Sequence, residues 1–123
     1  MYAVTEHDVQ NAVIDYLLLK GWLILRVNAG AVSGEYQGRQ RFVSFVRWFA
    51  AGILPAQQTK GVADVIALSP GGRFAAFEIK RPGKRAGKDQ IAFLDEVRAR
   101  GGIAGVIDSL ESLEALLERE GEY

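Results

Sequence analysis

GVADVIALSPGGRFAAFEIK, residues 61–80, specifies the centre of the fold. Its two apolar runs, at 63–69 and 73–80, are separated by Pro-Gly-Gly, a combination typical of a tight turn. This pattern predicts a β-hairpin. The second run ends in Glu-Ile-Lys, which places two opposite charges two positions apart on a strand that is otherwise apolar. We therefore expect this strand end to serve a purpose other than packing.

The segments around the hairpin predict three helices and two further strands. Apolar residues recur at helical spacing between Thr5, a candidate helix cap, and Gly21, a typical helix end. Aromatic and branched residues over 22–28 predict a strand. After the hairpin we expect a helix over 88–100, a short buried strand over 103–107, and a last helix capped by Asp108 or Ser109.

Residues 29–60 form the least regular part of the sequence. Their first part, GAVSGEYQG at 30–38, is rich in turn-forming residues. The following RQRFVSFVRWFAAGIL, at 39–54, alternates weakly and predicts either a strand or a short helix. The predicted order is therefore helix, strand, insert, two strands, helix, strand, helix. This order indicates an α/β fold with a mixed β-sheet flanked by helices.

Length and composition restrict the class of protein. A chain of 123 residues can bury one core, so we expect a single domain over 1–123. Hydrophobic residues make up 49% of the chain, which favours a globular domain over a disordered one. No apolar run is long enough to span a membrane, and the first residues do not resemble a signal peptide, so we expect a cytoplasmic protein. The absence of cysteine excludes disulfides and thiolate metal sites.

The formal net charge of zero conceals a basic central segment. Residues 61–88 hold six Lys or Arg against two acids, whereas residues 89–123 hold three arginines against nine acids. Four of these cations lie in a glycine-rich stretch directly after the hairpin, where we expect a mobile loop: Arg81, Lys84, Arg85 and Lys88. They are candidates to clamp DNA phosphates, although charge that merely solubilises the loop is the alternative.

Strand alternation brings three charged residues of the hairpin together. Glu78 and Lys80 are two positions apart and so share one face of their strand. Asp64 opens the partner strand, and in a hairpin the first residues of one strand lie beside the last residues of the other. We therefore expect all three side chains at one end of the sheet. The alternative is an ordinary ion pair on an edge strand, which would stabilise the protein little.

Two carboxylates held this close are suited to a divalent cation. Mg²⁺ or Mn²⁺ binds oxygen ligands and retains several waters, so one or two carboxylates are sufficient. Such an ion polarises a phosphate and activates a water, and a nearby lysine can orient that water. Glu6, on the first predicted helix, is a candidate third carboxylate. The pattern therefore predicts metal-dependent hydrolysis of a phosphodiester.

The hairpin and the predicted helix after it resemble a known family. The features are G-x-x-D at 61–64, E-x-K at 78–80, and a glutamine at the start of that helix. Together they resemble the VRR-NUC (virus-type replication-repair nuclease) domain of the PD-(D/E)XK nuclease superfamily. The resemblance implies a restriction-endonuclease-like core and a Mg²⁺- or Mn²⁺-dependent endodeoxyribonuclease. Stand-alone members of this size resemble phage enzymes that act on branched DNA such as Holliday junctions, which implies a phage or bacterial origin.

The resemblance also implies roles for individual residues. Asp64 and Glu78 would bind the metal together with the main-chain carbonyl of Ile79, and Lys80 would assist catalysis. Three further residues match family positions that support the site or contact DNA: Gln90, Glu6 and Asn28. The sequence departs from the family at Asp108, where basic residues are common.

Other functions and a dimer stay open. The fold could serve a catalytically silent nucleic-acid-binding module, or a protein-interaction domain that docks a partner on the apolar insert 42–54. This insert contains six large apolar residues within thirteen positions. We expect it to form the interface of a homodimer, because a symmetric junction needs two cuts. The alternative is that the insert completes the core of its own domain.

Overall fold

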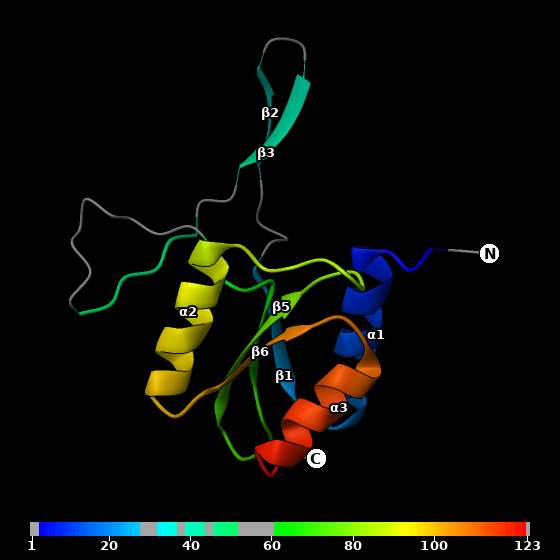
Figure 1. Ribbon diagram of the computed structural model, residues 1–123, viewed down its shortest axis with the longest axis vertical. Helices are drawn as coiled ribbons and strands as arrows, with labels where there is room; N and C mark the ends of the chain where they lie inside the picture. The colour runs from blue at the N-terminus through cyan, green and yellow to red at the C-terminus, as the bar shows by residue number, and fades with distance from the viewer. Residues whose placement is uncertain (1–2, 28–31, 37–38, 44–45, 52–60, 123) are drawn as a thin grey trace.

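The computed structural model describes residues 3–27, 32–36, 39–43, 46–51 and 61–122. Along the chain the elements are α1 (Glu6–Leu19), β1 (Leu23–Arg26), β2 (Val32–Tyr36), β3 (Arg39–Val43), β4 (Val65–Leu68), β5 (Phe74–Ile79), α2 (Lys88–Ala99), β6 (Ile103–Ile107) and α3 (Leu110–Arg119) (Figure 1). The predicted order is confirmed. Asn28, the predicted DNA contact after the first strand, lies outside the described residues.

The central sheet has four strands in the order β1-β4-β5-β6. β4 pairs antiparallel with both β1 and β5, whereas β5 and β6 are parallel, so the sheet is mixed as predicted. In the predicted hairpin, Val65 is paired with Phe77 and Leu68 with Phe74. The parallel pair is connected through α2, because parallel neighbours need a crossover.

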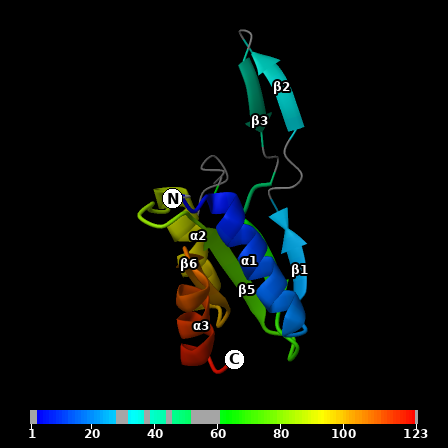
Figure 2. The same cartoon turned by 90° about the vertical axis from the view of Figure 1, so that its right-hand side faces the viewer.

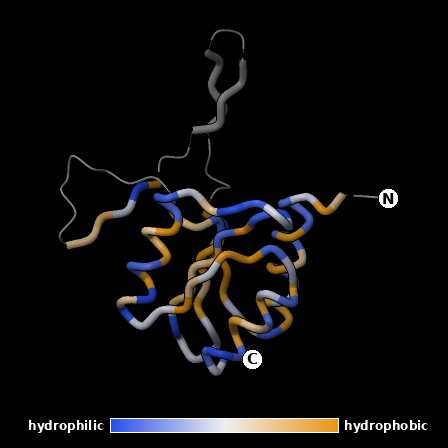
Figure 3. The backbone as a smooth tube through the Cα atoms, in the orientation of Figure 1, coloured by the Kyte–Doolittle hydropathy of each residue, from blue (hydrophilic) through white to orange (hydrophobic). Residues whose placement is uncertain are grey.

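Helices cover both faces of this sheet. α1 and α3 lie together on one face and α2 lies on the other (Figures 1 and 2). Alternation along β5 separates the two cores: Phe77 and Ile79 pack with α1 and α3, whereas Ala76 packs with α2. Apolar segments are concentrated in the interior between the layers (Figure 3).

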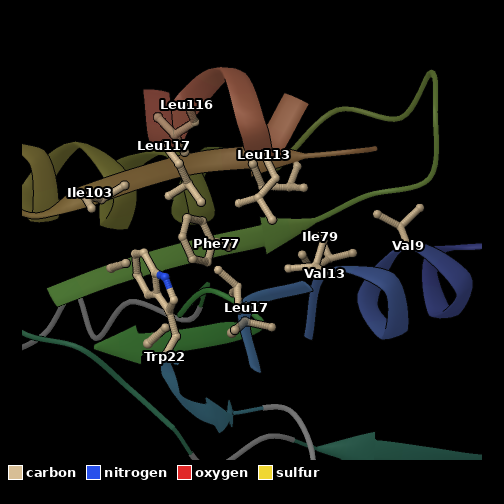
Figure 4. Packing of buried hydrophobic residues seen from close by; sticks show 14 residues of the cluster. Val9, Val13, Leu17, Trp22, Phe77, Ile79, Ile103, Leu113, Leu116 and Leu117 are labelled. Carbon is tan, nitrogen blue, oxygen red and sulfur yellow. The ribbon is translucent and has the colours of Figure 1, made fainter. Parts of the chain in front are cut away.

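The larger core lies between β5, α1 and α3. Figure 4 shows Phe77 between Leu17 of α1 and Leu117 of α3, and all three side chains are buried. The ring of Trp22 lies 6.3 Å from that of Phe77, in a tilted arrangement. This core holds β5 rigidly, and β5 carries Glu78.

The insert contains a second, two-stranded sheet. β2 and β3 pair antiparallel, with Tyr36 opposite Arg39, and the pair extends away from the central sheet (Figures 1 and 2). A strand is one of the two alternatives expected for 39–54, and β3 confirms it for Arg39–Val43, whereas 44–45 and 52–54 lie outside the described residues. β2 differs from the expectation, because its sequence, VSGEY, has the composition of a turn-rich segment.

Part of the insert packs against the domain itself. Trp48 is buried, and its ring lies 5.6 Å from that of Phe93 on α2. Trp48 therefore belongs to the core of its own domain. Phe49 and Val46 are exposed, so the described part of the insert also contributes apolar surface. No helix in the described ranges is long and apolar enough to cross a membrane.

Candidate active site

Asp64 and Glu78 lie side by side at one end of the central sheet. Asp64 directly precedes β4, and because Val65 is opposite Phe77, the next position along places Asp64 opposite Glu78. Both carboxyl groups are nearly removed from solvent, with 7% of Asp64 and 1% of Glu78 exposed. Buried carboxylates are rare unless they are paired or bind a cation.

The main chain of both neighbouring strands holds Asp64 in place. Its Oδ2 accepts a hydrogen bond from the N–H of Ile79 at 2.9 Å. Its carbonyl oxygen accepts a hydrogen bond from the N–H of Val27, just after β1, at 3.0 Å. Asp64 is therefore fixed before any ligand binds.

The carboxyl group of Glu78 is only half satisfied. Oε1 accepts a hydrogen bond from Nε2 of Gln90 at 2.7 Å and lies 3.7 Å from Nζ of Lys80. Oε2 is buried, and among the described residues it has no hydrogen-bond partner. Asp64 could accept a hydrogen bond from this group only if Glu78 carried a proton, because two ionised carboxylates have no donor between them.

The pKa of Glu78 is raised to about 9, and burial is the main cause. The charge of Asp64 and hydrogen bonding to Asp64 contribute to this rise, whereas the charge of Lys80 opposes it. Glu6 makes the smallest contribution, an increase. Without a cation, Glu78 is therefore protonated at neutral pH, and a bound cation would have to displace that proton.

Gln90 connects the site to the start of α2. While its Nε2 donates to Glu78, its Oε1 accepts a hydrogen bond from the N–H of Gly87, the residue before the helix, at 2.7 Å. Because the amide oxygen is engaged by a donor and the amide nitrogen by an acceptor, its orientation is determined by the contacts.

Gly61, the first residue of G-x-x-D, allows the chain before β4 to approach the start of α2 closely. It has a φ of +90°, and a Cβ at this position would lie 2.7 Å from main-chain atoms of Asp89 and Gln90. Only glycine permits both this backbone conformation and this approach to α2. The glycine is part of the pattern recognised in the sequence, but the physical reason for it depends on the packing of α2.

Residues 4–111 match the family model of the VRR-NUC domain. The chain belongs to the VRR-NUC family. A solved structure named as a VRR_NUC domain shares the fold, with a TM-score of 0.60 and 20% sequence identity over 94% of this chain and 97% of that chain. No curated protein matches the sequence. The protein is therefore a nuclease-family domain with the α/β fold predicted from its sequence.

In this VRR-NUC domain, the predicted site residues divide into two groups. Asp64, Glu78, Lys80 and Gln90 are brought together, and Ile79 joins them through its N–H. Glu6 lines a neighbouring cavity, which Lys80 also lines but Asp64 and Glu78 do not. Among the described residues, no three His, Cys, Asp or Glu side chains are grouped closely enough to hold a metal. Asp64 and Glu78 are the adjacent carboxyl groups of this site, and the role of Glu6 as a third metal ligand stays a prediction.

The predicted DNA-binding residues are also divided. Arg81, Lys84 and Arg85 line the cavity that contains Lys80 and Glu6, whereas Lys88 begins α2 and does not line it. The expected mobile loop contains an ordered turn, in which the N–H of Lys84 donates to the carbonyl of Arg81 at 3.1 Å. Thr5, predicted only as a helix cap, lines the same cavity next to Glu6.

Proposed function

We propose that this domain is a Mg²⁺- or Mn²⁺-dependent endodeoxyribonuclease that hydrolyses phosphodiester bonds in branched DNA. The observation that carries the proposal is the buried pair of carboxyl groups of Asp64 and Glu78, in which Oε2 of Glu78 has no hydrogen-bond partner among the described residues unless Glu78 carries a proton. Leaving a buried polar atom unpaired costs about 1–3 kcal/mol. A hard cation is the partner that would satisfy both carboxyl groups at once.

Asp64 and Glu78 would hold the cation, and the carbonyl of Ile79 is the main-chain candidate beside them. A bound divalent cation would supply Lewis-acid polarisation of the phosphate and acidify a bound water. The hydrogen bonds from Ile79 to Asp64 and from Gln90 to Glu78 orient the two carboxyl groups in advance.

Lys80 would act on the water and the phosphate. Its ammonium group is 3.7 Å from Oε1 of Glu78, and only 17% of its side chain is exposed. An ammonium group at this position can orient a water by hydrogen bonding and offset negative charge that develops on phosphate oxygens. Arg81, Lys84, Arg85 and Lys88 would bind the DNA backbone nearby, with Asn28 as a further contact.

The proposed preference for branched DNA would require a homodimer. One small domain offers one such site, and two symmetric cuts across a junction require two sites. Exposed Phe49 and Val46 are the described apolar residues of the insert that could join two copies, whereas Trp48 is engaged in its own core.

The test is incubation of the purified protein with labelled linear, nicked, flapped and four-way DNAs in Mg²⁺, Mn²⁺ or EDTA. We expect cleavage that depends on metal and is strongest on a branched substrate. Asp64→Asn, Glu78→Gln and Lys80→Gln should each abolish it in a folded protein, as checked by circular dichroism. Metal-independent binding of DNA without cleavage would instead indicate the catalytically silent module. Unchanged cleavage by any of the three variants would exclude the assigned site.

A further inference from the structure

A cavity of about 340 Å³ lies next to the site and is lined almost entirely by cations and the start of α1. Its charged residues are Lys80, Arg81, Lys84 and Arg85, with Glu6 as the single acid, so its formal charge is +3 (four minus one). A water molecule needs only roughly 10–15 Å³. The cavity can therefore hold a larger anionic group together with its waters.

Three of the four cations of this cavity form no ion pair with an acid in the described part of the chain; the fourth, Lys80, lies 3.7 Å from Glu78. Arg73, Arg98 and Arg100 each form an ion pair with a carboxylate. In the described part of the chain, Arg81 and Arg85 form none. Lys84 likewise has no acidic partner there. Their charge therefore remains available to an anion.

The backbone holds these cations in position. Pro82 and Gly83 occupy the two central positions of the turn that the Arg81–Lys84 hydrogen bond closes, and Gly83 has a φ of +87°. Proline followed by such a glycine is typical of a type II turn, which restricts the loop. The N–H of Lys80 donates to the carbonyl of Ile107 at 3.0 Å, which fixes the start of the loop to the sheet.

The dipole of α1 offsets part of the negative charge that Glu6 and Asp8 bring to its first turn, beside the cavity. The helix begins at Glu6, and the first N–H groups of a helix have no partner within it. Thr5 caps one of them, because its Oγ1 accepts a hydrogen bond from the N–H of Asp8 at 3.1 Å. This contribution is secondary to that of the four cationic side chains.

We propose that the cavity binds the phosphate that neighbours the scissile phosphate on the same DNA strand. The scissile phosphate has to lie against Asp64 and Glu78, and neither of these lines the cavity. Lys80 belongs to both places, since it approaches Glu78 and also lines the cavity. The two phosphates would therefore lie on either side of Lys80. The inference rests on the proposed function, because it takes DNA as the ligand.

The test is a set of duplexes, each with one phosphate replaced by an uncharged methylphosphonate at successive positions, bound in EDTA. The proteins are the wild type, the triple variant Arg81→Gln, Lys84→Gln, Arg85→Gln, and Lys88→Gln as a control just after the same loop but outside the cavity. A methylphosphonate at one particular position should weaken binding by the wild type. It should also reduce the slope of log binding constant against log salt concentration by roughly 0.9. The methylphosphonate at that position should not weaken binding by the triple variant. It should weaken binding by Lys88→Gln as much as it weakens binding by the wild type.

The outcomes separate this inference from the proposed nuclease activity. Binding in EDTA requires no cleavage. If one methylphosphonate position weakens binding by the wild type but not by the triple variant, and no metal supports cleavage, the phosphate site is supported and the nuclease activity is contradicted. The phosphate site would be overturned if the protein cleaved DNA but no methylphosphonate position affected the wild type more than the triple variant. It would also be overturned if the triple variant weakened binding equally for every position of the methylphosphonate. A matched duplex with or without a terminal phosphate distinguishes a strand end from an internal phosphate as the bound group.

Discussion

Nε2 of Gln90 donates a hydrogen bond to Oε1 of Glu78 at 2.7 Å, across the boundary between α2 and β5. This bond engages one carboxyl oxygen of Glu78, whereas the other, Oε2, is buried and has no hydrogen-bond partner in the described part of the chain unless Glu78 is protonated. We therefore propose that Gln90 is a positioning residue, which determines the oxygen that Glu78 offers to a ligand.

Gln90→Leu should weaken metal binding without removing the site. Loss of a hydrogen bond that orients a metal ligand typically costs about 10–100-fold in affinity or activity. We expect the Mn²⁺ concentration for half-maximal cleavage to rise by that factor, and maximal cleavage to recover largely at high Mn²⁺. A purely structural role would instead lower the melting temperature and leave the Mn²⁺ dependence unchanged.

Glu78→Gln should abolish a loss of stability at high pH in the metal-free protein. The pKa of Glu78 is raised from an ordinary value of 4.5 to about 9, so between these values the folded state holds a proton that the unfolded state has released. The free energy of unfolding therefore falls with rising pH across this window, by up to about 1.4 kcal/mol per pH unit. Urea unfolding in EDTA at pH 6 and 8.5 measures it. The exposed Glu114→Gln is the control and should keep the wild-type dependence; equal slopes for Glu78→Gln and wild type would contradict the raised pKa.

Metal binding should release a proton from Glu78. Because the cation binds the ionised carboxylate, the Kd for Mn²⁺ should fall as the pH rises toward 9, by up to about tenfold per pH unit. Titration calorimetry at pH 7 in two buffers with different heats of ionisation counts the released protons, and we expect close to one. A count near zero would mean that Glu78 is already ionised in the metal-free protein.

Gly61→Ala should disturb the site more than a matched glycine substitution. Both Gly61 and Gly72 have a φ near +90°, so alanine costs about 1–2 kcal/mol at either position through the backbone alone. At Gly61 the added Cβ also lies 2.7 Å from the main chain of Gln90, whereas at Gly72 it meets nothing within 4 Å. We expect Gly61→Ala to weaken Mn²⁺ binding and Gly72→Ala to leave it unchanged. An equal effect of both variants on Mn²⁺ affinity would show that the approach of Gly61 to α2 is unimportant.

The proposed homodimer should depend on Phe49. This side chain is 65% exposed, whereas its neighbour Trp48 is 7% exposed and serves the core. We expect light scattering at micromolar concentration to give twice the mass of one chain, and Phe49→Glu to give folded monomers. Trp48→Glu should instead destabilise the domain, because it places a charge in the core. A wild-type monomer that still makes paired cuts in a junction would contradict the dimer.

The local sequence pattern was sufficient to predict the hairpin and the grouping of Asp64, Glu78 and Lys80 at one end of the sheet. Alternation along β5 determines that Glu78 shares a face with Lys80, and the turn at 70–72 determines that Asp64 returns to the same end of the sheet. These relations involve residues close along the chain, so the period of a strand and the chemistry of a turn decide them. The same is true of the predicted cap at Thr5, because Asp8, its partner in the structure, is three residues away.

Contacts between distant elements depend instead on how the helices pack on the sheet. The burial of Trp48 against Phe93, the approach of Gly61 to α2 and the separation of Lys88 from Arg81, Lys84 and Arg85 are all of this kind. A periodic pattern shows which face of an element is apolar, but not which neighbour covers it. Packing places Lys80 between the buried carboxyl groups and the cationic cavity, because α1 and α2 approach that end of the sheet from opposite faces.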